Sequence, residues 1–307
     1  MGPKPFLVYS PPFWQGSAGI FALHRLADNI ASLGFEVFFK FYNLSYMSYT
    51  EEELSSRPEK FYNPDDRHNL ALRRQKPPEN LDSVIVIYPE TLPENPLGAN
   101  NVVRYVMNFP HKNMFPMVPG PRDFILAYWP EYYPKHHHHA LAILPDNKDL
   151  VLAQCVLPFQ SRDIDCTYIG KGVKVPGYYK INGTTEITRE WPETKHGLYD
   201  LLRRTRYLFT WDPLTALNFE AVFWGAIPVY LRFAPYFEEA PEFGLAPYPF
   251  GVAQPSPSTL AYTDLLHRFD NYDAERGVML ERYKRIKTQE LTLTMEFIQR
   301  AHRHFGY

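Results

Sequence analysis

The feature that most constrains this chain is an alternation of strand, loop, helix and strand within its first 40 residues. Residues 6–9 form a short apolar run, and residues 20–33 carry apolar side chains at helical spacing. Gly34 is a fitting end for that helix, and a second apolar run follows at 35–39. This order predicts a β-α-β unit, whose two strands are parallel and whose crossover is right-handed. The chain therefore begins as an α/β protein.

The same alternation continues along the rest of the chain. Apolar runs that end at proline, glycine or polar residues predict further strands at 84–88, 124–128, 165–169, 186–188, 207–210 and 227–231. Helical spacing predicts helices at 100–107, 196–205, 214–224 and 272–305. Residues 43–80 are polar and charged, and we interpret them as a surface excursion with a helix.

These elements divide into two α/β halves, which suits a chain of 307 residues. We expect a Rossmann-like N-terminal domain at 1–145 and a Rossmann-like C-terminal domain at 146–285. We expect a final helix at 286–307 to pack back on the N-terminal domain. Open parallel sheets bind ligands beyond the carboxyl ends of their strands. We therefore expect two doubly wound domains that face each other across a ligand cleft.

Composition excludes several classes of protein. Lys and Arg number 32 against 34 Asp and Glu, and this net charge of −2 predicts that nucleic acid is not a partner. Two cysteines cannot build a disulfide framework, which indicates a reducing compartment. No apolar run approaches the roughly 20 residues that span a bilayer, and the N-terminus does not resemble a secretory signal. We expect a cytoplasmic protein, with peripheral contact at the inner face of the membrane left open by the basic segment 282–287.

The most informative segment runs from Thr210 to Val229. Asp212 follows a predicted strand and precedes a predicted helix, and Glu220 lies two helical turns later among apolar residues. A carboxylate in such surroundings needs a partner, and a pair of sugar hydroxyls suits it well. The spacing equally allows Asp212 to cap the helix and Glu220 to pair with a buried arginine.

This segment resembles the acidic signature of the retaining glycosyltransferases of family 4, which have the GT-B fold. In that family an acidic residue, seven others and a glutamate precede a small-residue helix that leads to Gly-x-Pro-Val. Glu220 and residues 225–229 match the second half, whereas Asp212 stands where the family usually has glutamate. The resemblance implies that Glu220 hydrogen-bonds the ribose of the donor and that Asp212 faces the donor sugar. These two residues are the predicted catalytic pair.

Other segments resemble the same family and supply candidate substrate-binding residues. The glycines and serine of Gly16-Ser17-Ala18-Gly19 allow the backbone and a helix N-terminus to approach a diphosphate, although a tight turn explains them equally well. Lys171 is flanked by glycines and is the candidate cation for that diphosphate. The remaining candidates lie at predicted loops or helix starts, where they could contact sugars or simply face solvent: His111, Glu131 and Thr215.

We predict neither a metal ion nor a cofactor. The consecutive histidines 136–139 project in different directions and rarely build one tetrahedral site. Asp163 and Asp165 are spaced like a metal-binding Asp-x-Asp motif but stand at the entry to a strand. The family resemblance also implies catalysis without a metal ion.

The family resemblance therefore implies a metal-independent, retaining hexosyltransferase. It would move a hexose or deoxyhexose from a nucleoside diphosphate sugar to a glycan or a lipid-linked acceptor, in cell-surface polysaccharide or glycan biosynthesis. One alternative is a GT-B-like module that binds glycans or nucleotide sugars without turnover. Another is a sugar-nucleotide-processing enzyme such as an epimerase. The donor base, the sugar, the acceptor and the linkage are not identified by the sequence.

Overall fold

The computed structural model describes residues 2–13, 17–42, 76–108, 117–130, 133, 136–144, 156–170, 178, 180–212, 215–231 and 272–307. The chain divides into two compact units. Unit 1 comprises Met1–Pro145 and Arg285–Tyr307, and unit 2 comprises Asp146–Lys284. The predicted excursion at 43–80 lies almost entirely outside the described residues.

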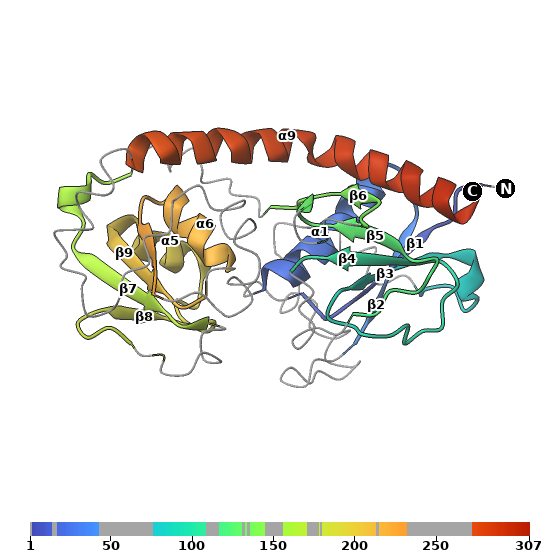
Figure 1. Cartoon of the computed structure of the whole chain (residues 1–307), viewed down its shortest axis with the longest axis horizontal. Helices are drawn as coiled ribbons and strands as arrows, with labels where there is room; N and C mark the ends of the chain where they lie inside the picture. Colours follow the sequence, from blue (N-terminus) through green and yellow to red (C-terminus); the bar gives the residue numbers. More distant parts are fainter. Residues whose placement is uncertain are drawn as a thin grey trace. The chain divides into compact units, whose positions relative to one another are not determined.

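Unit 1 is built on a six-stranded sheet in which every described pairing is parallel. Its spatial order is β2-β1-β3-β4-β5-β6 (Figure 1). The strands are β1 (Phe6–Ser10), β2 (Val37–Phe41), β3 (Ile85–Pro89), β4 (Val102–Val106), β5 (Phe124–Ala127) and β6 (His139–Ala140). A short 3-10 helix, η1 (Leu81–Ser83), precedes β3.

The predicted β-α-β unit is confirmed by β1, β2 and the helix between them, α1 (Ala18–Ser32). The side chain of Ser17 caps this helix and accepts a hydrogen bond from the N–H of Ile20 at 3.4 Å. Gly34 ends it with φ of +84° and donates its N–H to Ala31, while Phe35 donates to the carbonyl of Ile30. This left-handed turn satisfies the last carbonyls of the helix, which explains the glycine at that position.

One face of the unit 1 sheet is covered by two helices, α1 and the C-terminal part of α9 (Tyr272–Phe305) (Figure 1). Leu23 and Leu26 of α1 and Phe297 of α9 are all but fully buried in the same cluster. The ring of Phe297 lies 5.8 Å from that of Phe6 in β1 and 5.8 Å from that of Phe124 in β5. The last turns of the chain thus belong to the core of its first unit.

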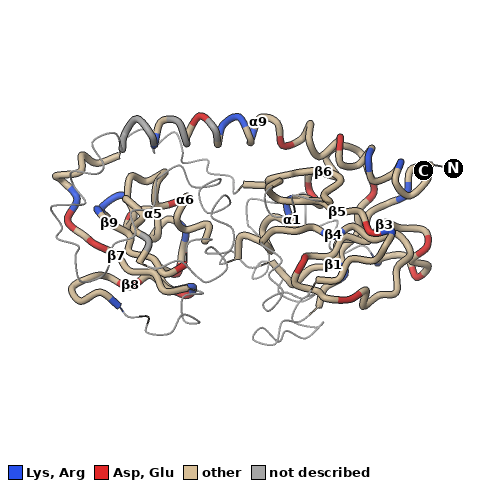
Figure 2. The backbone as a smooth tube through the Cα atoms, in the orientation of Figure 1, with Lys and Arg blue, Asp and Glu red and all other residues tan. Residues whose placement is uncertain are grey.

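A buried acid anchors α9 to α1. Glu290 is 2% exposed, and its carboxylate accepts hydrogen bonds from Asn29 Nδ2 at 2.9 Å and Lys287 Nζ at 2.6 Å. Arg25 of α1 forms an ion pair with the same carboxylate at 3.4 Å. Both signs of charge occur along α9 (Figure 2). None of the described helices is long and apolar enough to cross a membrane.

The prediction of a helix at 100–107 is wrong, because this segment contains β4. Three of the five residues of β4 are valine, and all five are buried between β3 and β5. A short apolar run does not reveal its period, whereas β-branched side chains favour a strand buried on both faces.

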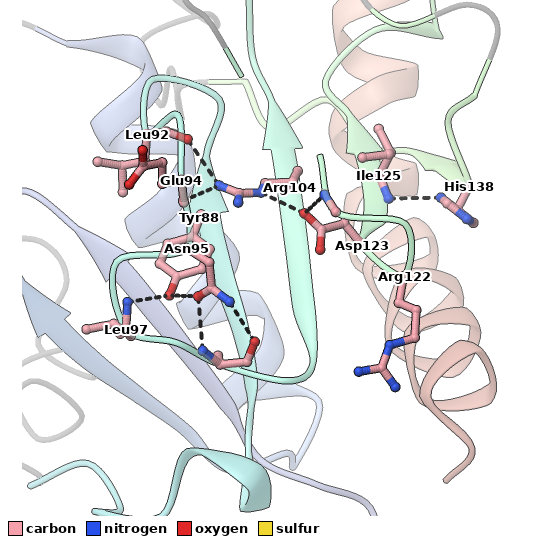
Figure 3. A network of polar contacts seen from close by, with 12 residues as sticks. Tyr88, Leu92, Glu94, Asn95, Leu97, Arg104, Arg122, Asp123, Ile125 and His138 are labelled. Atoms are coloured by element: carbon pink, nitrogen blue, oxygen red, sulfur yellow. Dashed lines mark hydrogen bonds and ion pairs between the residues drawn. The ribbon is translucent and has the colours of Figure 1, made fainter. Parts of the chain in front are cut away.

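Arg104 in the middle of β4 organises the loops around it (Figure 3). It is 2% exposed, and its guanidinium pairs with Asp123 at 2.9 Å and donates to the carbonyls of Leu92 and Glu94 at 3.0 Å each. The guanidinium also lies 5.0 Å from the ring centre of Tyr88. A buried cation is tolerable here because its donors meet acceptors from two loops.

Unit 2 contains a four-stranded parallel sheet in the order β10-β9-β7-β8. Its strands are β7 (Ile164–Tyr168), β8 (Thr185–Ile187), β9 (Thr205–Thr210) and β10 (Ile227–Tyr230). Its described helices include η4 (Phe159–Ser161), α5 (Lys195–Arg204) and α6 (Ala216–Phe223), besides the start of α9. Both units are therefore Rossmann-like α/β structures, as the sequence predicts.

Candidate functional site

The unit 2 sheet has a topological switch point between β7 and β9. From β7 the chain order runs outward to β8 on one side and to β9 and β10 on the other. In open parallel sheets, ligands bind beyond the carboxyl ends of the strands at such a point. Here β7 ends at Tyr168 and β9 ends at Thr210, and the N–H of Trp211 donates to the carbonyl of Tyr168 at 3.0 Å.

Asp212 and Gly170 meet at this switch point. Gly170 has φ of +51°, and a Cβ atom there would lie 2.8 Å from Asp212 Oδ2 and 2.4 Å from Tyr168 Cε1. A side chain cannot occupy that space, so the Asp212 carboxylate lies directly against the glycine backbone. The carboxylate predicted to face the donor sugar and the glycine loop after β7 are thus brought together by the fold.

The backbone of Asp212 is held in place by neighbouring polar groups. Its N–H donates to Thr210 Oγ1 at 3.1 Å, and its carbonyl accepts from Asn218 Nδ2 at 3.1 Å. Thr215 supplies the N-cap of α6, since its Oγ1 accepts from the N–H of Leu217 at 3.4 Å. The alternative in which Asp212 itself caps the helix is therefore not the arrangement observed.

Tyr168 lies beside the Asp212 carboxylate at this edge of the sheet. Burial raises the pKa of the Tyr168 phenol, and the Asp212 carboxylate beside it raises this pKa further. The charge of Arg189 and hydrogen bonds with Thr215 and Arg189 oppose the rise. The phenol therefore stays protonated at neutral pH, and Arg189, which follows β8, reaches the same edge of the sheet.

Glu220 is buried in α6 and pairs with a lysine. Its side chain is 8% exposed, and Lys195 Nζ, at the start of α5, lies 2.6 Å from Glu220 Oε1. The Lys195 side chain is 39% exposed, so the pair reaches solvent on the lysine side. The alternative in which Glu220 pairs with a buried arginine is wrong, because its partner is a lysine that is partly exposed.

Sequence reasoning overlooked Tyr168, Arg189 and Lys195. Arg189 and Lys195 lie more than 15 residues from Asp212 in the chain, and no periodicity links them to it. A signal for Tyr168 existed, because it is the last residue of a strand that leads into the glycine loop.

Two candidate residues of unit 1, Ser17 and Gly19, are described, and they follow β1, which with β3 flanks the switch point of that sheet. Ser17 caps α1, and a Cβ atom on Gly19 would lie 3.7 Å from Met107 Cε. Glu90, directly after β3, is 4% exposed and accepts a hydrogen bond from the Met107 N–H at 3.1 Å. The other predicted site residues, Gly16, His111, Glu131 and Lys171, lie outside the described residues.

The residues that suggest metal binding have other partners in the structure. His138 Nδ1 accepts from the N–H of Ile125 at 2.9 Å, and His139 Nε2 hydrogen-bonds the carbonyl of Leu293 at 2.9 Å. Asp163 and Asp165 form ion pairs with arginines 204 and 206 of the α5–β9 segment. Within the described part of the chain, no group of three or more His, Cys, Asp or Glu is arranged to hold a metal ion.

Comparison with known proteins does not establish a family for this chain. No protein-family model matches this chain, and a search of curated proteins gives no match. One solved structure that resembles it is an alpha-glucosyltransferase in complex with UDP and a 13-mer DNA containing a HMU base. It is 11% identical, the match covers 95% of each chain, and the TM-score is 0.39. Family 4 is therefore not established for this chain.

The same structure corrects one expectation. We predicted that nucleic acid is not a partner, yet a glycosyltransferase structure that resembles this chain holds DNA. The prediction rested on net charge, which sums over the whole molecule, whereas local potentials at one surface decide contacts with nucleic acid. The exclusion of nucleic acid is therefore withdrawn.

Proposed function

We propose that this protein transfers a sugar from a nucleoside diphosphate sugar, and that the donor binds at the carboxyl edge of the unit 2 sheet. The observation that carries this proposal is the buried Asp212 carboxylate, held against the backbone of Gly170 at the switch point. Such a carboxylate has acceptor positions for donor hydroxyls, and the close backbone allows a ligand to approach.

The chemistry would be mainly electrostatic. As the bond between the sugar C1 and the diphosphate oxygen breaks, negative charge develops on the leaving diphosphate. The acceptor hydroxyl oxygen bonds to C1, and its proton passes to the departing diphosphate oxygen. The N-terminus of α6, which Thr215 caps, and Lys171, next to Gly170 in the chain, are our candidates to stabilise that charge. We propose that Asp212 faces the donor sugar and that the anomeric configuration is retained without a metal ion.

Glu220 would bind the ribose of the donor. A carboxylate offers about four acceptor positions, so Glu220 can accept hydrogen bonds from ribose hydroxyls while it remains paired with Lys195. Lys195 also offsets the cost of burying the Glu220 charge before the donor arrives.

Unit 1 would supply the acceptor side. The loop at 16–19 would approach the diphosphate through the N-terminus of α1, and His111 and Glu131 would contact sugars. A glycan or glycolipid acceptor in polysaccharide biosynthesis, and a cleft between the two domains, stay predictions. Nucleic acid belongs among the acceptors to be tested.

The test is release of nucleoside diphosphate from UDP-, GDP- and dTDP-sugars, and of CMP from CMP-sugars, with glycans, glycolipids and DNA oligonucleotides as acceptors. We expect Asp212→Asn and Glu220→Gln to lower turnover of the active donor by about 100-fold or more. Asp200→Asn is the matched control, because Asp200 is an exposed carboxylate on α5. Donor binding without turnover would favour the binding module, and isomerisation of the donor alone would favour an epimerase. Absence of any nucleotide binding by folded protein would refute the proposal.

A further inference from the structure

An exposed tryptophan lies in the segment that connects β8 to α5. Trp191 is 44% exposed, whereas the other tryptophans that the structure describes, at 129, 211 and 224, are partly or fully buried. A single exposed apolar residue needs no explanation by itself. Two further observations concern Trp191: its backbone is held by hydrogen bonds, and residues near it in the chain contact the candidate site.

The backbone of Trp191 is anchored on both sides. Its N–H donates to Thr188 Oγ1 at 3.0 Å, and its carbonyl accepts from the N–H of Thr188 at 2.8 Å. On the other side, Thr194 Oγ1 accepts from the N–H of Gly197 at 3.1 Å, which ties this segment to the first turn of α5. The Trp191 backbone is therefore held while its ring meets solvent.

The segment that carries Trp191 runs along the edge of the donor site. It starts at the carboxyl end of β8, next to β7, and Arg189 within it is close enough to lower the pKa of the Tyr168 phenol. Four residues after Trp191, Lys195 pairs with Glu220. Along the chain, Trp191 thus stands between Arg189, which influences Tyr168, and Lys195, the partner of the glutamate proposed to bind ribose.

We propose that the indole ring of Trp191 is the stacking platform for the nucleobase of the donor. The inference rests on the proposed function and extends it. A base is attached directly to the ribose, so a ribose at Glu220 brings the base toward the segment that ends at Lys195. A flat, exposed ring whose backbone is already anchored suits this role, because every nucleobase has a π-face and little order is lost on stacking.

Calorimetric titration of the full chain with UDP, GDP, dTDP, CDP and inorganic pyrophosphate tests this inference. Trp191→Ala should weaken binding of the preferred nucleotide by about 5- to 150-fold, the range expected for loss of one stacked base. Trp191→Phe keeps an aromatic face and should stay within about threefold of the wild type. Pyrophosphate has no base, so its affinity should be the same in all variants. Tyr307→Ala, which removes an exposed aromatic side chain in unit 1, is the matched control and should change nothing.

Several results would overturn the inference. If Glu220→Gln abolishes nucleotide binding while Trp191→Ala leaves it unchanged, the donor site is correct and the stacking platform is wrong. Equal weakening of pyrophosphate and nucleotide would mean that Trp191 acts on the fold of the site instead of on the base. Weakened binding of a single-stranded DNA oligonucleotide, with nucleotide affinity intact, would assign the ring to an acceptor. Absence of nucleotide binding in the wild type would refute the proposed function itself.

Discussion

Removal of Lys195 should destabilise unit 2 far more than removal of the charge it neutralises. The Glu220 side chain is 8% exposed and that of Lys195 is 39% exposed, so the two ends of the ion pair differ in access to water. Lys195→Met leaves a buried carboxylate without its 2.6 Å partner. Breaking a fully buried pair costs about 3–5 kcal/mol, and solvent access at this site reduces our estimate to about 2–3 kcal/mol. Glu220→Gln leaves an ammonium that water can solvate, and should cost about 0.5–1 kcal/mol.

A double-mutant cycle on the thermal midpoint tests this reasoning. At about 2–4 °C per kcal/mol, Lys195→Met should lower the midpoint by roughly 4–12 °C, and Glu220→Gln by less than about 4 °C. The double variant Lys195→Met/Glu220→Gln should be more stable than Lys195→Met alone, because it no longer buries an unpaired carboxylate. Equal effects of the two single substitutions, or additive effects in the double variant, would refute the reasoning. In that case the loss of the partly exposed lysine would cost no more stability than the loss of the buried glutamate charge.

Three further predictions concern a buried ion pair, the glycine at the candidate site and a buried histidine. Arg104→Met should lower the free energy of unfolding by about 3–5 kcal/mol, because it leaves Asp123 and two loop carbonyls without the guanidinium. Urea unfolding measures this change, and a decrease below about 1 kcal/mol would contradict the prediction. Gly170→Ala should abolish donor binding and leave the secondary structure intact, because the added Cβ would collide with Asp212 and because Gly170 has φ of +51°. If calorimetry gives the variant the affinity of the wild type, the loop can move and the prediction is wrong. Burial lowers the pKa of His139 below its ordinary value of 6.5, so the unfolded chain binds more protons there and stability is lost as the pH falls through 6.5. The thermal midpoint should therefore drop between pH 7.5 and 5.5, and His139→Gln should flatten that drop; an unchanged slope would rule out this histidine as its source.

Much of the fold can be predicted from local sequence. Helix α1 has both a clear apolar stripe and clear ends, since Ser17 caps it and Gly34 closes it. The strand β4 shows the limit of this reasoning. Residues 100–107 were predicted to be helical, yet the valines there lie in a strand buried between two others. Burial on both faces removes the alternation by which a strand is usually recognised.

The candidate site likewise combines residues that local sequence indicates with partners that it does not. Asp212 follows a strand and Glu220 lies on an apolar helix, and the resemblance of their spacing to the family 4 signature makes them the predicted pair. Their partners were not predicted, because Lys195 precedes Glu220 by 25 residues. The pairing depends on how α5 and α6 are placed against each other, and no local pattern encodes that.

By itself the sequence determined the α/β alternation and the ends of α1, because these depend on propensity, periodicity and spacing within a few turns. The choice of Asp212 and Glu220 as site residues stays a prediction. Only the tertiary structure decided which groups meet. It placed the Asp212 carboxylate against Gly170, paired Glu220 with Lys195 and packed α9 on α1. The physical reason is that burial of charges and apolar faces selects partners by their position in space, and strand pairing brings together residues that are far apart in the chain.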